Sequence, residues 1–323
     1  MFRRRQRADS VTLRLYYASD IHGSDVLWRK FLNAAGFYQV DTLIMGGDLC
    51  GKGLAPVVRM NGGWTLPIAG EERHITDESE LEELEQLVRQ SGLYPRRMTA
   101  DEFERLSQPA ALEAMFEATM IEGVRDWMAL ADERLRGSAV TAYVMPGNDD
   151  PWRVDEALNG HEKVVACDEK VVRIGEHELL SLGWSNQTPW HTARELDEEE
   201  LYARIKNLAE QLESPQRAIF NLHVPPYNSG LDTATELDET LAPVLLGGQP
   251  HEIPVGSSAV RQLIEEYQPA LALHGHIHES RGIVEIGRTV CINPGSNYST
   301  GRIDGAVVEL SADGVRNKHL VNG

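Results

Sequence analysis

Short apolar runs typical of buried β-strands occur at residues 12–19 and 41–46, with a segment of helical character at 25–37 between them. This order predicts a βαβ unit with parallel strands. A third strand is predicted at 139–145, which is rich in β-branched and aromatic residues. After residue 150 the pattern predicts two sheets packed together with helices outside them. These later elements are strands at 163–167, 170–174, 178–183, 217–222, 270–274, 281–286, 289–293 and 305–310, and helices at 195–213 and 257–267.

A different pattern occupies residues 52–137, between the second and third predicted strands. It opens with a Gly/Pro-rich loop and then becomes helical. Asp77 with Glu80, and Thr99 with Glu102, have the spacing of helix N-terminal caps. We therefore predict a single domain over residues 1–323 that carries 52–137 as a largely helical insertion.

The last helix of the insertion is predicted at 110–136, and its apolar residues recur near helical spacing. We interpret this stripe as a face packed on the main body of the protein. The alternatives are a cap over the site or a surface through which the chain forms an oligomer. The stripe consists of Leu112, Met115, Phe116, Val124, Trp127, Met128 and Leu135.

Composition narrows the class of protein further. The 323 residues are 41% hydrophobic and include three scattered cysteines, which is typical of a globular chain in a reducing cytoplasm. No apolar run approaches the roughly 20 residues that a membrane span needs, so no membrane association is expected. The net charge of −19 disfavours a nucleic-acid-binding surface. The arginine-rich start, residues 3–7, is interpreted as a solvated arm.

Polar residues follow five of the predicted strands, at the point where each strand ends. Carboxyl ends of parallel strands meet at one edge of a sheet, so these side chains are expected to converge. Carboxylates and imidazoles suit Mn²⁺, Fe or Zn²⁺. Glycines 46, 47, 147 and 275 allow close approach of the backbone or a positive φ. The clusters are Asp20 with His22; Asp48; Asn148 with Asp149 and Asp150; His223; and His274 with His276 and His278.

Each cluster alone has a structural interpretation: a Gly-Gly-Asp is usually a turn, and a lone His223 is usually a packed core histidine. The histidine pair in Gly275-His276-Ile-His278 has few structural uses. His274, beside that pair, is expected to pack at the strand end. All five clusters in this order predict a metal site, in which Asp48 offers two oxygens to two ions.

The ordered set resembles the calcineurin-like metallophosphoesterase superfamily. The resemblance spans nearly the whole chain except residues 52–137, and residues 293–296 (Asn-Pro-Gly-Ser) also resemble a loop of bacterial and archaeal members. The matching motifs are Asp20-Ile-His22, Gly47-Asp48, Gly147-Asn148-Asp149-Asp150, His223 and Gly275-His276-Ile-His278.

The resemblance implies an α/β fold, a four-layer α/β/β/α sandwich of two mixed sheets. It also implies two divalent metal ions (Mn, Fe or Zn). Its metal ligands would be Asp20, His22 and His278 on one ion, Asn148, His223 and His276 on the other, and Asp48 between them. The expected reaction is hydrolysis of a phosphate ester by a hydroxide that bridges the two ions, with Asn148 helping to bind the charged substrate oxygens.

One position departs from the superfamily pattern, because Asp149 stands where many members have a histidine that is thought to assist the leaving group. Small prokaryotic members without that histidine are often described as phosphodiesterases. Asp149 is therefore a catalytic candidate and favours a phosphodiesterase. It is interpreted as a protonated acid, a hydrogen-bond partner for His223 or a turn residue, with the last two favoured.

The expected substrate is a small phosphate ester, and aromatic residues near the site would suit a nucleotide-like one. Trp64 and the segment 183–191, with Trp184 and Trp190, are candidates for the rim of the pocket, with loop packing as the alternative. His191 is a candidate for substrate contact or proton transfer. A phosphomonoesterase or a nuclease of the same superfamily, or a non-catalytic metal-binding scaffold, remains an alternative. The net charge of −19 speaks against the nuclease, and the complete ligand set speaks against the scaffold.

Overall fold

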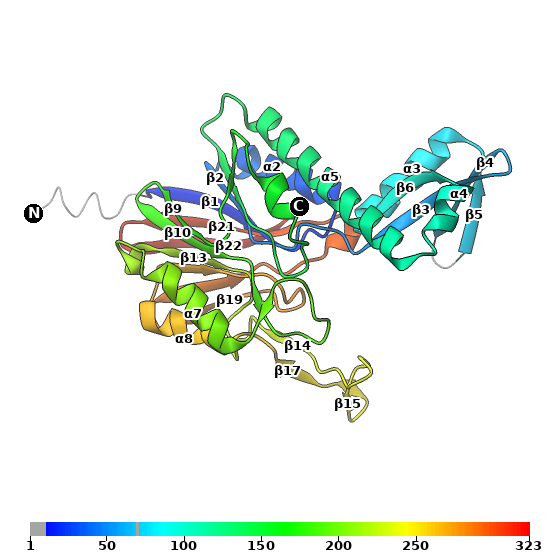
Figure 1. Cartoon of the computed structure of the whole chain (residues 1–323). Coiled ribbons are helices and arrows are strands. Elements are labelled where there is room, and N and C mark those ends of the chain that lie inside the picture. The colour runs from blue at the N-terminus through cyan, green and yellow to red at the C-terminus, as the bar shows by residue number, and fades with distance from the viewer. Residues whose placement is uncertain (1–10, 69–70) are drawn as a thin grey trace, which may run out of the picture.

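The computed structural model describes residues 11–68 and 71–323. The arginine-rich start, interpreted as a solvated arm, lies outside these residues. Two six-stranded sheets lie at the centre of the fold (Figure 1). The first sheet has the order β22-β21-β1-β2-β7-β8, and its β1, β2, β7 and β8 run parallel. Its strands are β1 (Leu13–Ala18), β2 (Thr42–Met45), β7 (Thr141–Val144), β8 (Val164–Ala166), β21 (Asp304–Ser311) and β22 (Gly314–Asn322).

The second sheet has the order β19-β20-β18-β13-β10-β9. Its four central strands, β20, β18, β13 and β10, are parallel, and the strands at its two edges are antiparallel to their neighbours. The sheet consists of β9 (Lys170–Ile174), β10 (His177–Leu182), β13 (Ile219–Leu222), β18 (Leu271–Leu273), β19 (Gly282–Ile286) and β20 (Thr289–Asn293). Each sheet thus presents a set of parallel carboxyl ends along one edge.

Helices cover the outer face of each sheet, so the fold is the predicted four-layer α/β/β/α sandwich. Apolar side chains such as Leu15, Ile44 and Leu271 fill the space between the sheets and are fully buried. Burying a side chain of this size contributes roughly 1.5–3 kcal/mol, so this layer holds the two sheets together. The helices are α2 (Asp25–Tyr38), α5 (Pro109–Leu135) and α6 (Val154–Leu158) on the first sheet, and α7 (Glu198–Ala209) and α8 (Ser258–Tyr267) on the second.

None of the helices in the described part of the chain is long and apolar enough to cross a membrane.

Small elements complete the sandwich. Three two-stranded ribbons and two 3₁₀ turns decorate the second half of the chain. They are β11 (Ser185–Asn186) with β12 (Glu195–Leu196), β14 (Thr233–Thr235) with β17 (Glu252–Pro254), β15 (Leu245–Leu246) with β16 (Gln249–Pro250), η1 (Pro215–Arg217) and η2 (Tyr298–Thr300).

The segment between β2 and β7 contains a sheet that the sequence pattern did not predict. Four strands in the order β5-β4-β3-β6 form it, and it projects to one side of the sandwich (Figure 1). Both predicted helix caps are present: Asp77 accepts the N–H of Glu80, and Thr99 with Glu102 forms a reciprocal capping box. The elements are β3 (Gly53–Met60), β4 (Gly63–Ile68), β5 (Glu71–Ile75), β6 (Leu93–Thr99), α3 (Glu78–Gln90) and α4 (Ala100–Arg105).

Trp64 belongs to this small sheet rather than to the rim of the site. It lies in β4, on the projecting part of the insertion (Figure 1). The guanidinium groups of Arg59 and Arg97 lie 5.6 and 5.5 Å from the centroid of its ring. The rim position predicted for Trp64 is therefore wrong, because this ring packs against two arginines within the insertion.

Helix α5 connects the insertion to the main body. Its C-terminal half is buried against the first sheet and α2, where Trp127 stacks on Trp28 with a centroid distance of 5.5 Å. Its N-terminal half packs on the small sheet, with Met115 against the cluster of Val58 and Met98. The predicted packing on the main body is confirmed for the C-terminal half of the stripe. Leu112, at the start of the helix, is 41% exposed.

Candidate metal centre

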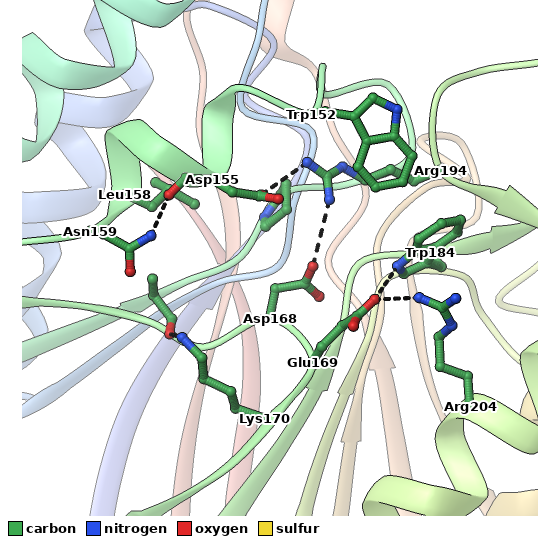
Figure 2. A pocket seen from close by; sticks show the side chains of 12 residues that line it. Trp152, Asp155, Leu158, Asn159, Asp168, Glu169, Lys170, Trp184, Arg194 and Arg204 are labelled. Carbon is green, nitrogen blue, oxygen red and sulfur yellow. Dashed lines mark hydrogen bonds and ion pairs between the residues drawn. The ribbon is translucent and has the colours of Figure 1, made fainter.

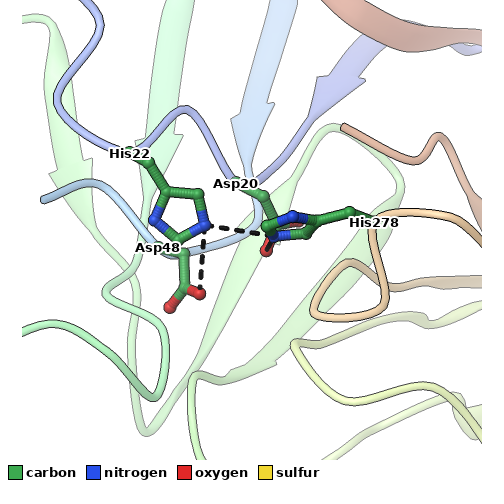
Figure 3. Close-up of side chains that lie close together, drawn as sticks. All are labelled: Asp20, His22, Asp48 and His278. Atoms are coloured by element: carbon green, nitrogen blue, oxygen red, sulfur yellow. Dashed lines mark hydrogen bonds and ion pairs between the residues drawn. The ribbon is translucent and has the colours of Figure 1, made fainter. Parts of the chain in front are cut away.

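The loops after five parallel strands bring the predicted donor residues together. Four of these side chains point toward one another, and their ligand atoms lie within 4.8 Å of one another (Figure 3). They are Asp20, His22, Asp48 and His278. The His22 Nε2 atom lies 3.1 Å from the Nε2 atom of His278. Asp20 and His22 follow β1, Asp48 follows β2, Asn148 follows β7, His223 follows β13, and His276 and His278 follow β18.

A second group of donors adjoins the first. The Asn148 Oδ1 atom lies 3.0 Å from His223 Nε2 and 2.8 Å from His276 Nδ1. Asp48 lies between the two groups: its Oδ1 is 3.4 Å from His223 Nε2, and its Oδ2 is 3.6 Å from His22 Nε2. One carboxylate thus faces both groups, which is the position predicted for a bridging ligand.

Backbone carbonyls orient two of the imidazoles. The Nδ1 atom of His22 lies 3.3 Å from the carbonyl of Cys50, and the Nδ1 atom of His223 lies 2.8 Å from the carbonyl of Gly46. A carbonyl accepts but does not donate, so each Nδ1 carries the proton. When the ring is neutral, each Nε2 therefore directs a lone pair into the donor groups, as a ligating imidazole does.

The loops that carry the donors have a strained backbone and little space. A Cβ atom at Gly147 would lie 2.1 Å from Asp48 Oδ1, so only glycine allows this approach. Non-glycine residues with positive φ cost roughly 1–3 kcal/mol each and cluster at functional sites. Four of the seven predicted donors have such a φ, namely Asp20 (56°), His22 (39°), Asp48 (51°) and His276 (65°).

Burial and neighbouring charges set the protonation of the donors. Burial lowers the pKa of His22 to about 3, so this imidazole is neutral at pH 7. Burial raises the pKa of Asp20, but the contacts with His278 and His223 outweigh it and bring the pKa to about 2. The pKa of Asp48 is also held well below its usual range, because the neighbouring imidazoles outweigh burial. Ionised carboxylates beside neutral imidazole form a donor set that suits a divalent cation.

His223 differs from His22 in charge. Burial lowers its pKa, but the carboxylates of Asp48 and Asp20 more than reverse this effect and raise the pKa to about 9. A ligating imidazole must be neutral, so a cation at this position competes with a proton. Metal binding at His223 is therefore expected to weaken as the pH falls.

Asp149 lies beside the donors but does not contact His223. Its backbone N–H donates to Asp48 Oδ1 over 3.1 Å, and its carboxylate forms an ion pair with Lys52. The suggestion that it is a hydrogen-bond partner of His223 is wrong, because the carbonyl of Gly46 has that role. The turn after Asn148 instead points this carboxylate toward the start of the insertion.

Asp150 is a buried residue whose role the sequence motif alone did not reveal. Its carboxylate accepts the backbone N–H groups of Leu49, Cys50 and Gly147 over 3.0, 2.7 and 2.7 Å. These amides belong to the loops that carry Asp48 and Asn148. One side chain therefore ties together the loops of the two donors.

The loop after β11 supports Asn148. Thr192 accepts a hydrogen bond of 2.8 Å from Asn148 Nδ2, which turns the amide oxygen toward the imidazoles. Glu195 in turn accepts the hydroxyl of Thr192 over 2.6 Å. His191 is exposed beside Thr192, and Trp190 is 61% exposed. Both are thus free to meet a ligand, and substrate contact by His191 stays a prediction.

His274 lies outside the donor groups, as expected. It is fully buried, and its Nδ1 lies 2.9 and 3.1 Å from the carbonyls of Leu222 and Val224. Burial lowers its pKa to about 4, so it is neutral. It therefore ties the end of β18 to the end of β13.

Trp184 lines a different pocket from the one predicted. This pocket, of about 520 Å³, is bounded by Trp152, Trp184, Arg194 and Arg204, and none of the seven donors lines it (Figure 2). Each guanidinium lies over a ring, Arg194 at 4.6 Å from Trp152 and Arg204 at 4.3 Å from Trp184. The structural alternative of loop packing therefore holds for Trp184.

Asp168, a carboxylate in this second pocket, makes stability depend on pH. Burial raises its pKa to about 6. Between about pH 4 and pH 6 the folded protein keeps a proton that the unfolded chain has lost, so stability falls as the pH rises through this window. Asp168→Asn removes the titration and still offers an oxygen to the N–H of Gly183. We expect the variant to gain roughly 2–3 kcal/mol relative to wild type between pH 4 and pH 7. Urea unfolding across that range measures the gain, and parallel profiles for the two proteins would contradict it.

Comparisons with known proteins extend these observations. No family model matches the chain. The uncharacterized protein MJ1162 of Methanocaldococcus jannaschii is 35% identical over 153 residues, which are 46% of this chain and 62% of that protein. The chain thus matches less than two thirds of that relative's length. One solved structure has a TM-score of 0.58 at 17% identity, covering 95% of this chain and 98% of its own.

A second solved structure, that of TT1561 from Thermus thermophilus, has a TM-score of 0.52 at 15% identity and covers 97% of this chain and 99% of its own. At these identities the likeness shows the fold alone. Fold and donors together define the class: an α/β sandwich with a buried Asp/His cluster that could hold a metal ion.

Proposed function

We propose that this chain is a metal-dependent hydrolase of phosphate esters, with phosphodiesters as its preferred substrates. The main support is the convergence of seven donor side chains, from five separate loops, into two groups that Asp48 joins. The order of these residues along the chain, which resembles that of metallophosphoesterases, supports the same proposal. Two buried ionised carboxylates side by side, Asp20 and Asp48, are costly unless a cation compensates their charge.

In this proposal Asp20, His22 and His278 hold one divalent ion, and Asp48 reaches both ions. Bound ions would lower the pKa of a shared water and offset the negative charge of the phosphate. Mn²⁺, Fe and Zn²⁺ all fit carboxylate and imidazole donors. The second ion would be held by Asn148, His223 and His276.

The remaining residues orient these donors and the substrate. The carbonyls of Cys50 and Gly46 hold two imidazoles in one tautomer, so no donor has to turn when the substrate binds. Asn148 Nδ2 donates one hydrogen bond to Thr192, and contact of Asn148 with a phosphate oxygen is part of the proposal. His191 is the proposed substrate contact on the exposed side of the same loop.

Two features support a small diester as substrate. Asp149 stands where a histidine would assist the leaving group of other phosphatases, so a substrate with a good leaving group or a diester is favoured. The net charge of −19 repels long polyanions, which disfavours nucleic acid. A small ester reaches the donors without a basic surface.

Metal-loaded protein is expected to hydrolyse bis(p-nitrophenyl) phosphate faster than p-nitrophenyl phosphate, and EDTA should abolish both activities. Absorbance at the p-nitrophenolate band measures turnover after loading with Mn²⁺, Fe²⁺ or Zn²⁺. Plasmid and single-stranded DNA in the same assay test the nuclease alternative. Absence of turnover of every ester by protein that retains its metal would refute the proposal and leave a metal-binding scaffold.

A further inference from the structure

The start of the insertion places a lysine beside the donor groups. Lys52 follows the Asp48 loop, and its backbone N–H donates to the carbonyl of Gly92 over 3.0 Å. The neighbouring N–H of Gly51 donates to the hydroxyl of Tyr94 over 2.9 Å. The two bonds fix the outgoing chain of the insertion to the residue just before the returning strand β6 and to the second residue of that strand. The backbone of Lys52 is therefore held in place at the edge of the site.

The Lys52 side chain turns from this anchor toward the donors. Its ammonium forms an ion pair with Asp149, whose own backbone N–H donates to Asp48. Asp149 thus links the ammonium of Lys52 to Asp48, the proposed bridging carboxylate. The positive charge of Lys52 lowers the pKa of His22 and of Asp48, where burial is the largest influence on each.

The ammonium of Lys52 has N–H groups available for a further hydrogen bond. It carries three N–H groups, and Asp149 is the one side chain with which it is paired in the described part of the chain. The Lys52 side chain is 42% exposed, so solvent and small ligands reach it. A lysine in this state binds phosphate oxygens as a mobile point charge.

We propose that Lys52 is a substrate-contacting residue, whose ammonium binds an oxygen of the phosphate group held at the donor residues. The inference deepens the proposed function and rests on it, because it names the group that receives the phosphate charge on the open side of the site. In the alternative, the ion pair of Lys52 with Asp149 only secures the start of the insertion to the donor loop.

Phosphate binding separates the two roles. Mn²⁺-loaded protein is titrated with inorganic phosphate by calorimetry, and its metal content is measured in parallel. We expect Lys52→Met to weaken phosphate binding by about tenfold or more, since a hydrogen bond to a charged group is lost. Manganese content should stay at the wild-type level. Lys52→Arg keeps a cationic donor and should restore most of the affinity.

The matched control is Lys318→Met. Lys318 is also a half-exposed lysine paired with one carboxylate, that of Glu285, but it lies on β22, which carries none of the donors. Phosphate affinity in this variant should equal that of wild type. The same three variants are then assayed for diester hydrolysis, where Lys52→Met should lower kcat/KM by about tenfold or more at unchanged metal content.

Each outcome bears on one proposal or the other. An affinity for phosphate that changes by less than about twofold in Lys52→Met would overturn the inference, as would loss of phosphate affinity in step with lost manganese. Failure of wild-type protein to bind phosphate would also overturn it. If wild-type protein binds phosphate through Lys52 but hydrolyses no ester, the proposed function fails and the phosphate contact stands.

Discussion

Asp48→Asn is expected to reduce phosphate-ester hydrolysis by at least roughly 10³-fold while the protein stays folded. The Asp48 side chain faces His223 with one oxygen and His22 with the other, so it serves both donor groups. Asparagine keeps the shape and an oxygen for the N–H of Asp149. It removes the negative charge and turns one oxygen into an N–H₂ group, which cannot bind a cation. Turnover of bis(p-nitrophenyl) phosphate and metal content measure the effect.

A matched control shows that the loss comes from the site. Asp168→Asn makes the same change at another carboxylate, which is partly buried in the second pocket, and should keep full activity. His223→Ala should resemble Asp48→Asn in activity, since it removes a donor from the second group. Circular dichroism and the unfolding midpoint test whether the variants are folded. Wild-type turnover by folded Asp48→Asn or His223→Ala would show that the donor assignment is wrong.

The sandwich could be predicted from the sequence because its buried strands carry a strong local signal. The runs at 12–19, 41–46 and 139–145 are apolar throughout most of their length, and they form β1, β2 and β7. Strands buried on both faces have this pattern, and few other structures do. The convergence of the polar residues then follows from geometry, since each lies at the carboxyl end of a parallel strand.

The small sheet of the insertion gave no such signal. Strand β5, Glu-Glu-Arg-His-Ile, is exposed at four of its five residues. Strands β3 and β6 contain Pro56 and Pro95, which normally argue against a strand. Pairing of β3 with β6 joins residues about 40 positions apart, so it depends on tertiary contacts that local pattern does not encode. The helix caps were found because a cap is defined within four residues.

The donor residues could be predicted, but the residues that hold them could not. Thr192 acts on Asn148 across 44 positions, and Lys52 meets Asp149 across 97. Neither pair has a spacing that marks it in the sequence. The sequence suggested Asp149 as the hydrogen-bond partner of His223 for the same reason. The actual partner is the backbone carbonyl of Gly46, a group that every residue type has. Side-chain chemistry is visible in a sequence, whereas backbone partners require the fold.

Asp150→Ala is expected to cost roughly 3–5 kcal/mol of unfolding free energy and to abolish stable metal binding. Three backbone N–H groups, from Leu49, Cys50 and Gly147, lose their acceptor in a buried place. Each buried donor left without a partner costs roughly 1–3 kcal/mol. The loops of Asp48 and Asn148 then lose their common tie. Urea unfolding measures the stability, and metal content after dialysis measures the second effect.

Asp232→Ala separates lost stability from lost positioning. Asp232 is an equally buried carboxylate that accepts backbone amides, among them those of Asn228, Ser229 and Gly256, over 2.7, 3.0 and 3.1 Å. Asn228 and Ser229 lie in the loop after β13, five and six residues beyond His223, and Gly256 lies on none of the donor loops. The variant should therefore lose comparable stability and still bind metal at the wild-type ratio. Full metal content in folded Asp150→Ala would show that the two donor loops hold their positions without this carboxylate. Loss of metal in both variants would assign the effect to general destabilisation.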